Sequence, residues 1–358
     1  MADSDNRMTY DGYLRIQDLL SLQDGPQGYM PKPCNNEMHF IVVHQTFELW
    51  FKVILRELDE IHQKMSQDVL PEQTIPELVH HFSRCTSIMK LMAEQWDVMQ
   101  TLSPQEFLSF RHRLGTSSGF ESWQMRAIEL KLGLKNQDRV QGMDPMAHFE
   151  KLMNSGSLDE KIYNELVEIQ NSPSIADLLR QWLARTPVDG NTPTVETMSK
   201  FIQKHLQSML EQANSAIEHM VSVGMGEEET LRARFEMGIK SARDFLEPSG
   251  EVDLARAGLL FIESYKDLPL LSWPRRLLDE IVAFEQSMLH FRSHHARMVE
   301  RMIGRRIGTG GSSGVDYLDQ TVKYRVFEDL WKVRTILIRP DALPELSKPE
   351  YYDFADQT

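Results

Sequence analysis

The feature that most constrains the fold is the stretch 37–66, the longest helical pattern in the chain. Aliphatic and aromatic residues follow one another between Phe40 and Leu55, so the first half has almost no polar face. A helix that is apolar all round is buried inside a protein. No stretch alternates apolar and polar residues for long enough to predict a sheet. We therefore expect an all-α fold in which other helices surround this one.

Helical periodicity also places the remaining elements. Ser103, Pro104 and Glu106 form a strong helix start, and a further helix is expected within 117–133, ending at a glycine cap. We expect the other helices at residues 75–101, 145–154, 158–170, 174–185, 194–222, 226–246, 252–267, 273–303 and 313–337.

The middle of the chain differs from its two ends. Residues 137–250 are more polar than the rest, and residues 186–193 form the clearest linker. We interpret 137–250 as an inserted helical subdomain and not as an independent domain. Residues 1–136, which begin with an N-terminal arm, and residues 251–358 then form the two parts of one core.

Composition narrows the classes of function. The chain of 358 residues has a formal net charge of −14, which argues against nucleic acid as a partner. It contains two cysteines, Cys34 and Cys85, and this scarcity fits a reducing cytoplasm. The polar start 1–7 does not resemble a signal peptide, and no apolar run reaches the length of a membrane span. We expect a cytoplasmic protein without a membrane segment.

Two adjacent histidines in the expected helix 273–303 are not equivalent. His295 lies within an apolar stripe, whereas His294 falls on the polar face. The stripe consists of Met288, Phe291, His295, Met298, Val299 and Met302. An imidazole that faces inward among such side chains suits an axial ligand to a haem iron. The structural alternative is a core histidine that is hydrogen-bonded to a carbonyl group. No Cys-x-x-Cys-His sequence is present, so covalent attachment of a haem is not expected.

A glycine-rich loop, 308–314, follows that helix and presents Thr309 and two serines. Glycine backbone adopts positive φ readily and lets a ligand approach closely. Phosphate-binding loops follow a strand, and P-loops are also followed by a lysine; here a helix precedes the loop and no lysine follows it. We therefore predict that the loop surrounds a small polar ligand or a cofactor. The structural alternative is a capping box made by Ser313 and Asp316.

Two polar residues stand in otherwise apolar helical patterns. His44 and Glu48 lie one turn apart on one face of the longest helix. A buried polar group without a partner costs about 1–3 kcal/mol, so His44 either faces a pocket or bonds to Glu48. Arg126 lies in the apolar centre of its helix. Its guanidinium either binds a substrate carboxylate through two hydrogen bonds or forms a surface ion pair with Glu129.

The chain resembles the tryptophan 2,3-dioxygenase family over nearly its whole length. These haem enzymes have a histidine fourteen residues before the threonine of a GTGGSSG loop, and His295 and Thr309 have that spacing. Further similar blocks lie at residues 10–14, 40–52, 117–126 and 178–187, the last resembling a segment of the longer, animal-type members.

The resemblance implies a helical homotetramer that binds b-type haem and uses O₂ to oxidise tryptophan. It implies that His295 is the axial ligand of the iron, that His44 meets the indole N–H and that Arg126 holds the substrate carboxylate. Thr309 would assist at the carboxylate or the ammonium group. The remaining implied contacts are Phe40, Tyr10, Tyr13 and Leu14 around the substrate, and Gly308, Gly310 and Trp123 around the haem. In this family the segment 10–14 reaches into a neighbouring subunit's pocket.

Residues near the expected site depart from the family's pattern at Asn35, at Met125 with the bulky Trp123 before it, and at Val315. The departures leave the iron ligand untouched but leave the identity of the substrate open. The first hypothesis is dioxygenation of L-tryptophan to N-formylkynurenine, the reaction that opens the kynurenine pathway of tryptophan catabolism. The second is addition of one oxygen atom to a substituted indole, giving an oxindole in specialised metabolism.

A third hypothesis is a haem or indole sensor that carries out no reaction. A sensor has less need of a full substrate-holding set. The joint presence of His44, Arg126 and Thr309 therefore argues against this function.

Overall fold

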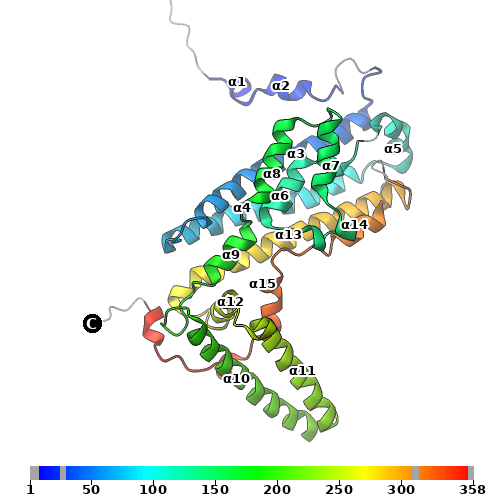
Figure 1. Ribbon diagram of the computed structural model, residues 1–358. Helices are drawn as coiled ribbons and strands as arrows, with labels where there is room; N and C mark the ends of the chain where they lie inside the picture. Colours follow the sequence, from blue (N-terminus) through cyan, green and yellow to red (C-terminus); the bar gives the residue numbers. More distant parts are fainter. Residues whose placement is uncertain (1–7, 25–29, 116, 309–313, 354–358) are drawn as a thin grey trace, which may run out of the picture.

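A bundle of long helices forms the core of the protein (Figure 1). The structure is a computed structural model that describes residues 8–24, 30–115, 117–308 and 314–353. The central helices are α3 (Asn35–Met65), α4 (Ile75–Met99) and α13 (Ser272–Ile303), and α4 packs along both of the others. The described residues contain no β-strand, only an isolated bridge between Val188 and Asn191. The predicted all-α class is therefore confirmed.

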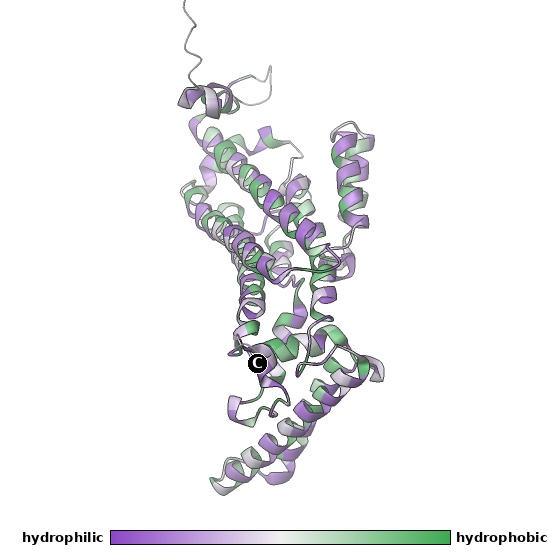
Figure 2. Cartoon of the chain, turned by 90° about the vertical axis from the view of Figure 1, so that its left-hand side faces the viewer, coloured by the Kyte–Doolittle hydropathy of each residue, from purple (hydrophilic) through white to green (hydrophobic). Residues whose placement is uncertain are grey.

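The central helices bury one side each and keep another side on the surface. Ile54 of α3, Phe82 of α4 and Phe284 of α13 are completely buried. Both apolar and polar residues occur along each long helix (Figure 2), as in helices that lie at the edge of a core. The expectation that other helices surround α3 on all sides is wrong for this chain, because Val42 and Leu49 are 40% and 49% exposed.

Shorter helices cover α3 on one side. The helix α6 packs on α3, α8 packs on α6, and α9 contacts both α3 and α6. Phe149 and Leu166 are buried with Ala127 in a second hydrophobic cluster beneath these helices. The helices are α5 (Pro104–Arg111), α6 (Trp123–Leu132), α7 (Pro145–Asn154), α8 (Glu160–Asn171) and α9 (Ile175–Leu183).

A helical hairpin extends away from the bundle (Figure 1). It consists of α10 (Val195–Ser222) and α11 (Glu228–Leu246), and α12 (Leu254–Ser264) joins it to α9. The predicted subdomain 137–250 contains this hairpin together with α7 to α9, which lie beside the bundle. Its boundaries stay a prediction. No helix among the described residues is both long enough and apolar enough to cross a membrane.

The predicted helix 313–337 is wrong. Within the described residues there are two short helices instead, α14 (Val315–Thr321) and α15 (Glu328–Lys332). The cause is Glu285 of α13, whose carboxylate accepts hydrogen bonds from the backbone N–H groups of Val326 and Phe327, at 2.6 and 3.0 Å. These two donors therefore bond to a side chain from another helix, and the chain turns there.

The N-terminal arm lies apart from the bundle (Figure 1). It forms α1 (Tyr10–Leu14) and α2 (Ile16–Ser21), which are separated by Arg15 in the left-handed region at φ 52°. Neither helix contains a buried residue. The arm thus exposes apolar side chains that this chain does not cover.

Candidate functional site

His44 of α3 is held in one tautomer. Its Nδ1 lies 2.8 Å from the backbone oxygen of Phe40, and a carbonyl oxygen only accepts, so Nδ1 carries the proton. Burial lowers the pKa of His44 below its ordinary value, which leaves the ring neutral at pH 7. Its Nε2 then bears a free lone pair. His44 is therefore able to accept a hydrogen bond from an N–H group of a ligand.

The suggested hydrogen bond between His44 and Glu48 is absent from the described residues, so that structural alternative is wrong. Glu48 instead accepts a hydrogen bond from Gln124 of α6, at 2.8 Å from its Oε2. The same amide of Gln124 also donates to the backbone oxygen of Glu48. Glu48 therefore fastens α6 to α3, and His44 is left free of it.

Aromatic rings connect His44 to α13. Phe40 lies against the His44 ring with centroids 4.1 Å apart, and Trp96 of α4 lies 6.3 Å from the same ring, edge to face. Phe47 packs on Trp96 at 4.3 Å, and Phe291 of α13 packs on Trp96 at 5.4 Å. Three helices thus converge on one apolar wall that carries a single acceptor nitrogen from α3.

His295 of α13 also contacts Trp96. The two rings stack with centroids 4.5 Å apart and planes 10° apart. Burial, assisted by nearby His44, lowers the pKa of His295 to about 4, so its ring is neutral with a lone pair available at pH 7. The neighbouring His294 is exposed, and its Nδ1 lies 3.0 Å from the backbone oxygen of Ala93. The two histidines are therefore unlike, as the sequence predicts.

The residues around His295 fit a haem. A haem site offers an axial ligand, often an imidazole nitrogen, between apolar walls, and a neutral imidazole among Phe291, Trp96 and methionines supplies both. The indole Nε1 of Trp96 is buried and has no hydrogen-bond partner among the described residues. Such an unpaired donor is costly and is expected where a bound group or water satisfies it.

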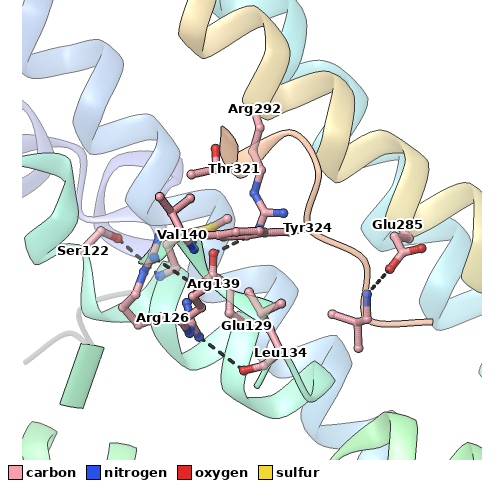
Figure 3. A network of polar contacts seen from close by, with 12 residues as sticks. Ser122, Arg126, Glu129, Leu134, Arg139, Val140, Glu285, Arg292, Thr321 and Tyr324 are labelled. Carbon is pink, nitrogen blue, oxygen red and sulfur yellow. Dashed lines mark hydrogen bonds and ion pairs between the residues drawn. The ribbon is translucent and has the colours of Figure 1, made fainter. Parts of the chain in front are cut away.

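Arg126 belongs to a buried ionic cluster (Figure 3). Its Nη1 lies 3.0 Å from Glu129, but Arg139 and Arg292 bind the same carboxylate at 2.5 and 2.8 Å. The side chain of Glu129 is only 2% exposed. Burial alone would raise the pKa of Glu129, but the three guanidinium groups outweigh it and lower the pKa to about 2. The expected pair of Arg126 with Glu129 exists, but it is buried and not a surface pair.

The glycine-rich loop is described only at its ends. Thr309 and Gly310 lie outside the described residues, so their predicted contacts stay predictions. Gly314 has φ 61°, and a side chain there would press on the backbone oxygen of Arg306, at 2.8 Å. The two ends of the loop therefore meet, and Gly308 lies beside them.

The remaining predicted contacts lie elsewhere in this chain. Tyr10 and Tyr13 of the arm are 77% and 73% exposed, and Leu14 is exposed beside them. Trp123 packs at the second hydrophobic cluster and lines an open groove of about 510 Å³ between α3, α6 and α8. The roles predicted for these residues stay predictions, and in this chain none of them shares a described ring contact with His44 or His295.

Sequence reasoning missed Trp96, Arg139 and Arg292, and it gave Glu129 only as a surface partner of Arg126. Trp96 reads as one more apolar residue of an amphipathic helix, and Arg139 follows a polar stretch with no pattern of its own. A weak signal exists for the other two. Glu129 lies three residues after Arg126, and Arg292 lies three residues before His295, so each is one helical turn from a predicted site residue.

The chain is similar to known proteins over nearly its whole length. The sequence profile of the family described as tryptophan 2,3-dioxygenase matches residues 2–337. Tryptophan 2,3-dioxygenase 2 of Ralstonia nicotianae is 39% identical over 365 residues, which cover 98% of this chain and 98% of the relative. Tryptophan 2,3-dioxygenase of Sorangium cellulosum is 40% identical over 361 residues, covering 97% and 87%. The enzyme of the same name from Dictyostelium discoideum is 34% identical over 366 residues, covering 97% and 88%.

Proposed function

The chain belongs to the tryptophan 2,3-dioxygenase family, and from this premise we propose that it inserts both atoms of O₂ across the indole C2–C3 bond of L-tryptophan, giving N-formylkynurenine. The names of its relatives support this reaction, because the alignments cover nearly the whole of each chain. The observation that carries the proposal is the pair of neutral imidazoles, His44 and His295, on one aromatic wall.

The cofactor in this proposal is haem b. When bound, it would supply the activation of O₂ that amino-acid side chains do not provide. His295 would hold the iron through a ring nitrogen, and Trp96 stacked on it would fix the orientation of the imidazole. Gly308 and Gly310 would let the loop backbone approach the cofactor closely.

His44 would orient the indole. Because its Nδ1–H is used by the backbone oxygen of Phe40, its Nε2 is left to accept the indole N–H. Phe40 lies against the His44 ring and would form part of the surface on which the flat indole rests. The hydrogen bond and this surface together would define the plane and the rotation of the ring, so that C2 and C3 face the oxidant.

Arg126 would anchor the amino-acid end of the substrate. Its guanidinium belongs to a buried cluster in which three arginines share the carboxylate of Glu129, and its Nε has no partner among the described residues. A carboxylate is the ligand that such a group prefers. Thr309 would assist at the carboxylate or the ammonium group.

A second copy of the chain would complete the site. The exposed Tyr10, Tyr13 and Leu14 of the arm, and the exposed Val42 and Leu49 of α3, are apolar surfaces that one chain leaves uncovered. We infer a homotetramer in which the arm of one subunit closes the pocket of another, working in the cytoplasm.

The test is product analysis with ¹⁸O₂. The reduced, haem-loaded protein is mixed with L-tryptophan, and the product is identified by mass spectrometry. Two labelled atoms in N-formylkynurenine are expected. A single labelled atom in an oxindole would show that the protein is a monooxygenase and not a dioxygenase. Binding of tryptophan without O₂ consumption would indicate a sensor.

A further inference from the structure

One carboxylate holds three arginines inside the protein (Figure 3). Arg126 and Glu129 come from α6, Arg139 from the segment that follows it, and Arg292 from α13. The side chains of Glu129, Arg139 and Arg292 are 2%, 2% and 9% exposed. In the described part of the chain, no other carboxylate forms an ion pair with these arginines.

The cluster therefore carries an excess of two positive charges out of water. Buried charges are strongly unfavourable unless they are paired, and guanidinium groups cannot shed their protons at physiological pH. An incomplete ionic cluster of this kind is stabilised by an anion that supplies the missing charge. The net positive charge of the cluster therefore favours binding of a negatively charged group.

The three arginines do not share Glu129 equally. Arg139 approaches Oε2 to 2.5 Å and Arg292 approaches Oε1 to 2.8 Å, whereas Arg126 has the longest contact, 3.0 Å to Oε2. Both carboxylate oxygens are thus engaged by residues other than Arg126. Arg126 is also the most exposed of the three, with 14% of its side chain accessible. It is the member best placed to receive an external anion.

Arg292 and Arg139 are themselves held in place. The guanidinium of Arg292 lies over the ring of Tyr324, 4.9 Å from its centroid. The hydroxyl of Tyr324 accepts the backbone N–H of Val140, next to Arg139, at 3.0 Å. Arg139 also donates to the backbone oxygen of Leu134. These contacts fix the two arginines on Glu129 from opposite sides (Figure 3).

We propose that Arg139 and Arg292 are positioning residues for the substrate carboxylate: by engaging both oxygens of Glu129 they leave the charge of Arg126 unneutralised and available to the ligand. This inference rests on the proposed function, since it takes Arg126 as the carboxylate anchor. It also places one of the two positioning residues on α13, a single turn before His295.

The variant Arg292→Met tests this role. Methionine keeps the bulk but frees Oε1, so Glu129 can bind Arg126 with both oxygens. We expect the dissociation constant of L-tryptophan, measured by calorimetry on the haem-loaded protein, to rise roughly tenfold, while that of L-tryptophanamide stays unchanged or falls. The amide is the matched ligand because it lacks the negative charge. Arg139→Met should act in the same direction.

Controls separate positioning from structural damage. Arg275→Met removes two other ion pairs of α13, with the buried Glu263 at 3.2 Å and with Asp279 at 2.5 Å, and should leave both dissociation constants as in the wild type. Arg292→Lys keeps the charge and should recover part of the lost affinity. In the double variant Arg126→Leu with Arg292→Met, the loss should be close to that of Arg126→Leu alone, because Arg292 acts through Arg126.

Three results would overturn the proposal: equal losses for tryptophan and its amide, additive losses in the double variant, or wild-type affinity in Arg292→Met. If Arg292→Met does not fold, Arg292→Lys and Arg139→Met decide by the same comparison of ligands. The proposed function itself would be refuted by a different result, namely a wild type that forms no N-formylkynurenine. A wild type that forms this product, together with an Arg292→Met variant that binds tryptophan normally, refutes the positioning role alone.

Discussion

Trp96 and His295 stack face to face, with ring centroids 4.5 Å apart and ring planes 10° apart. They come from α4 and α13, the two helices with the most extensive mutual packing in the core. The stack fixes the orientation of an imidazole that burial keeps neutral. It therefore presents a ring nitrogen in a defined direction, as an axial ligand to a metal requires.

Removing that imidazole should remove the cofactor. We predict that His295→Ala is purified without haem, or with haem that lacks its protein ligand, because the substitution removes the imidazole that stacks on Trp96. The measurement is haem content and the ferrous absorption spectrum. His294→Ala is the matched control, since His294 is exposed and bonds to the backbone of Ala93; it should keep both. Full haem and an unchanged spectrum in His295→Ala would assign the ligand elsewhere.

Removing the proposed carboxylate anchor should affect substrates selectively. Arg126→Leu should lower kcat/KM for tryptophan by roughly 2–4 kcal/mol in transition-state free energy, because a charge-assisted contact is lost. Haem content should stay as in the wild type. A simple indole without a carboxylate should lose little. Steady-state kinetics with both substrates makes the comparison, and equal losses would contradict the role of Arg126.

Much of the helical framework could be predicted from local pattern. The bounds expected for α7, α10 and α13 differ from the observed ones by at most one residue, because each helix has a clear apolar stripe and because α7 and α10 begin at a side-chain cap. The prediction of one continuous helix over 313–337 is wrong because Glu285, a residue of another helix, binds the backbone at Val326 and Phe327. Local periodicity contains no information about such a long-range contact.

Some features of the candidate site could likewise be predicted from local pattern, and others could not. The inward orientation of His295 follows from spacing along a single helix, and so does the difference from His294. The cluster around Glu129 does not, because Arg292 lies 163 residues further along the chain. Only the packing of α6 near α13 brings these charges together. Sequence patterns therefore could not predict that Arg292 contacts Glu129.

The packing of α12 on the end of α9 depends on one glycine. A side chain at Gly258 would overlap the backbone oxygen of Leu183 and crowd Thr186. We predict that Gly258→Ala lowers the free energy of unfolding by about 1–3 kcal/mol, as overpacking does, in denaturant titrations. Gly238→Ala on α11 is the control, because nothing lies within 4 Å of its new methyl group. It should stabilise the protein by about 0.5–1 kcal/mol. Equal effects of the two changes would refute the close approach.

His205 should make the protein less stable in acid. It is completely buried in α10, its Nε2 lies 2.9 Å from the backbone oxygen of Ile336, and its Nδ1 has no partner among the described residues. Burial lowers the pKa of His205. The unfolded chain takes up this proton as the pH falls through about 6.5 and the folded chain does not, so stability is lost in that direction.

The comparison is between the wild type and His205→Gln, which retains an N–H donor for Ile336. The free energy of unfolding, measured between pH 7.5 and 5.5, should fall more steeply in the wild type, by up to about 1.4 kcal/mol per pH unit. Other titrating groups are common to both proteins and cancel in the difference. Identical slopes would show that His205 does not contribute to the acid sensitivity.

His44→Ala distinguishes two mechanisms. An obligatory general base typically contributes about 10²–10⁴-fold to the rate. We expect less, because indole C3 is already nucleophilic and the N–H proton need not leave first. The free lone pair on Nε2 instead suits one orienting hydrogen bond, worth about 0.5–1.5 kcal/mol or roughly three- to tenfold in rate. Steady-state kinetics with tryptophan should show this modest loss.

The substrate 1-methyltryptophan provides the control for that prediction. It has no indole N–H to donate, so the wild type gains nothing from Nε2 of His44, and the methyl group meets the imidazole. The penalty of His44→Ala should therefore shrink with this substrate, or reverse as the smaller side chain makes room. Haem content must match the wild type in both assays. A loss of more than a thousandfold with tryptophan, at full haem content, would show that His44 moves a proton and does not merely orient the ring.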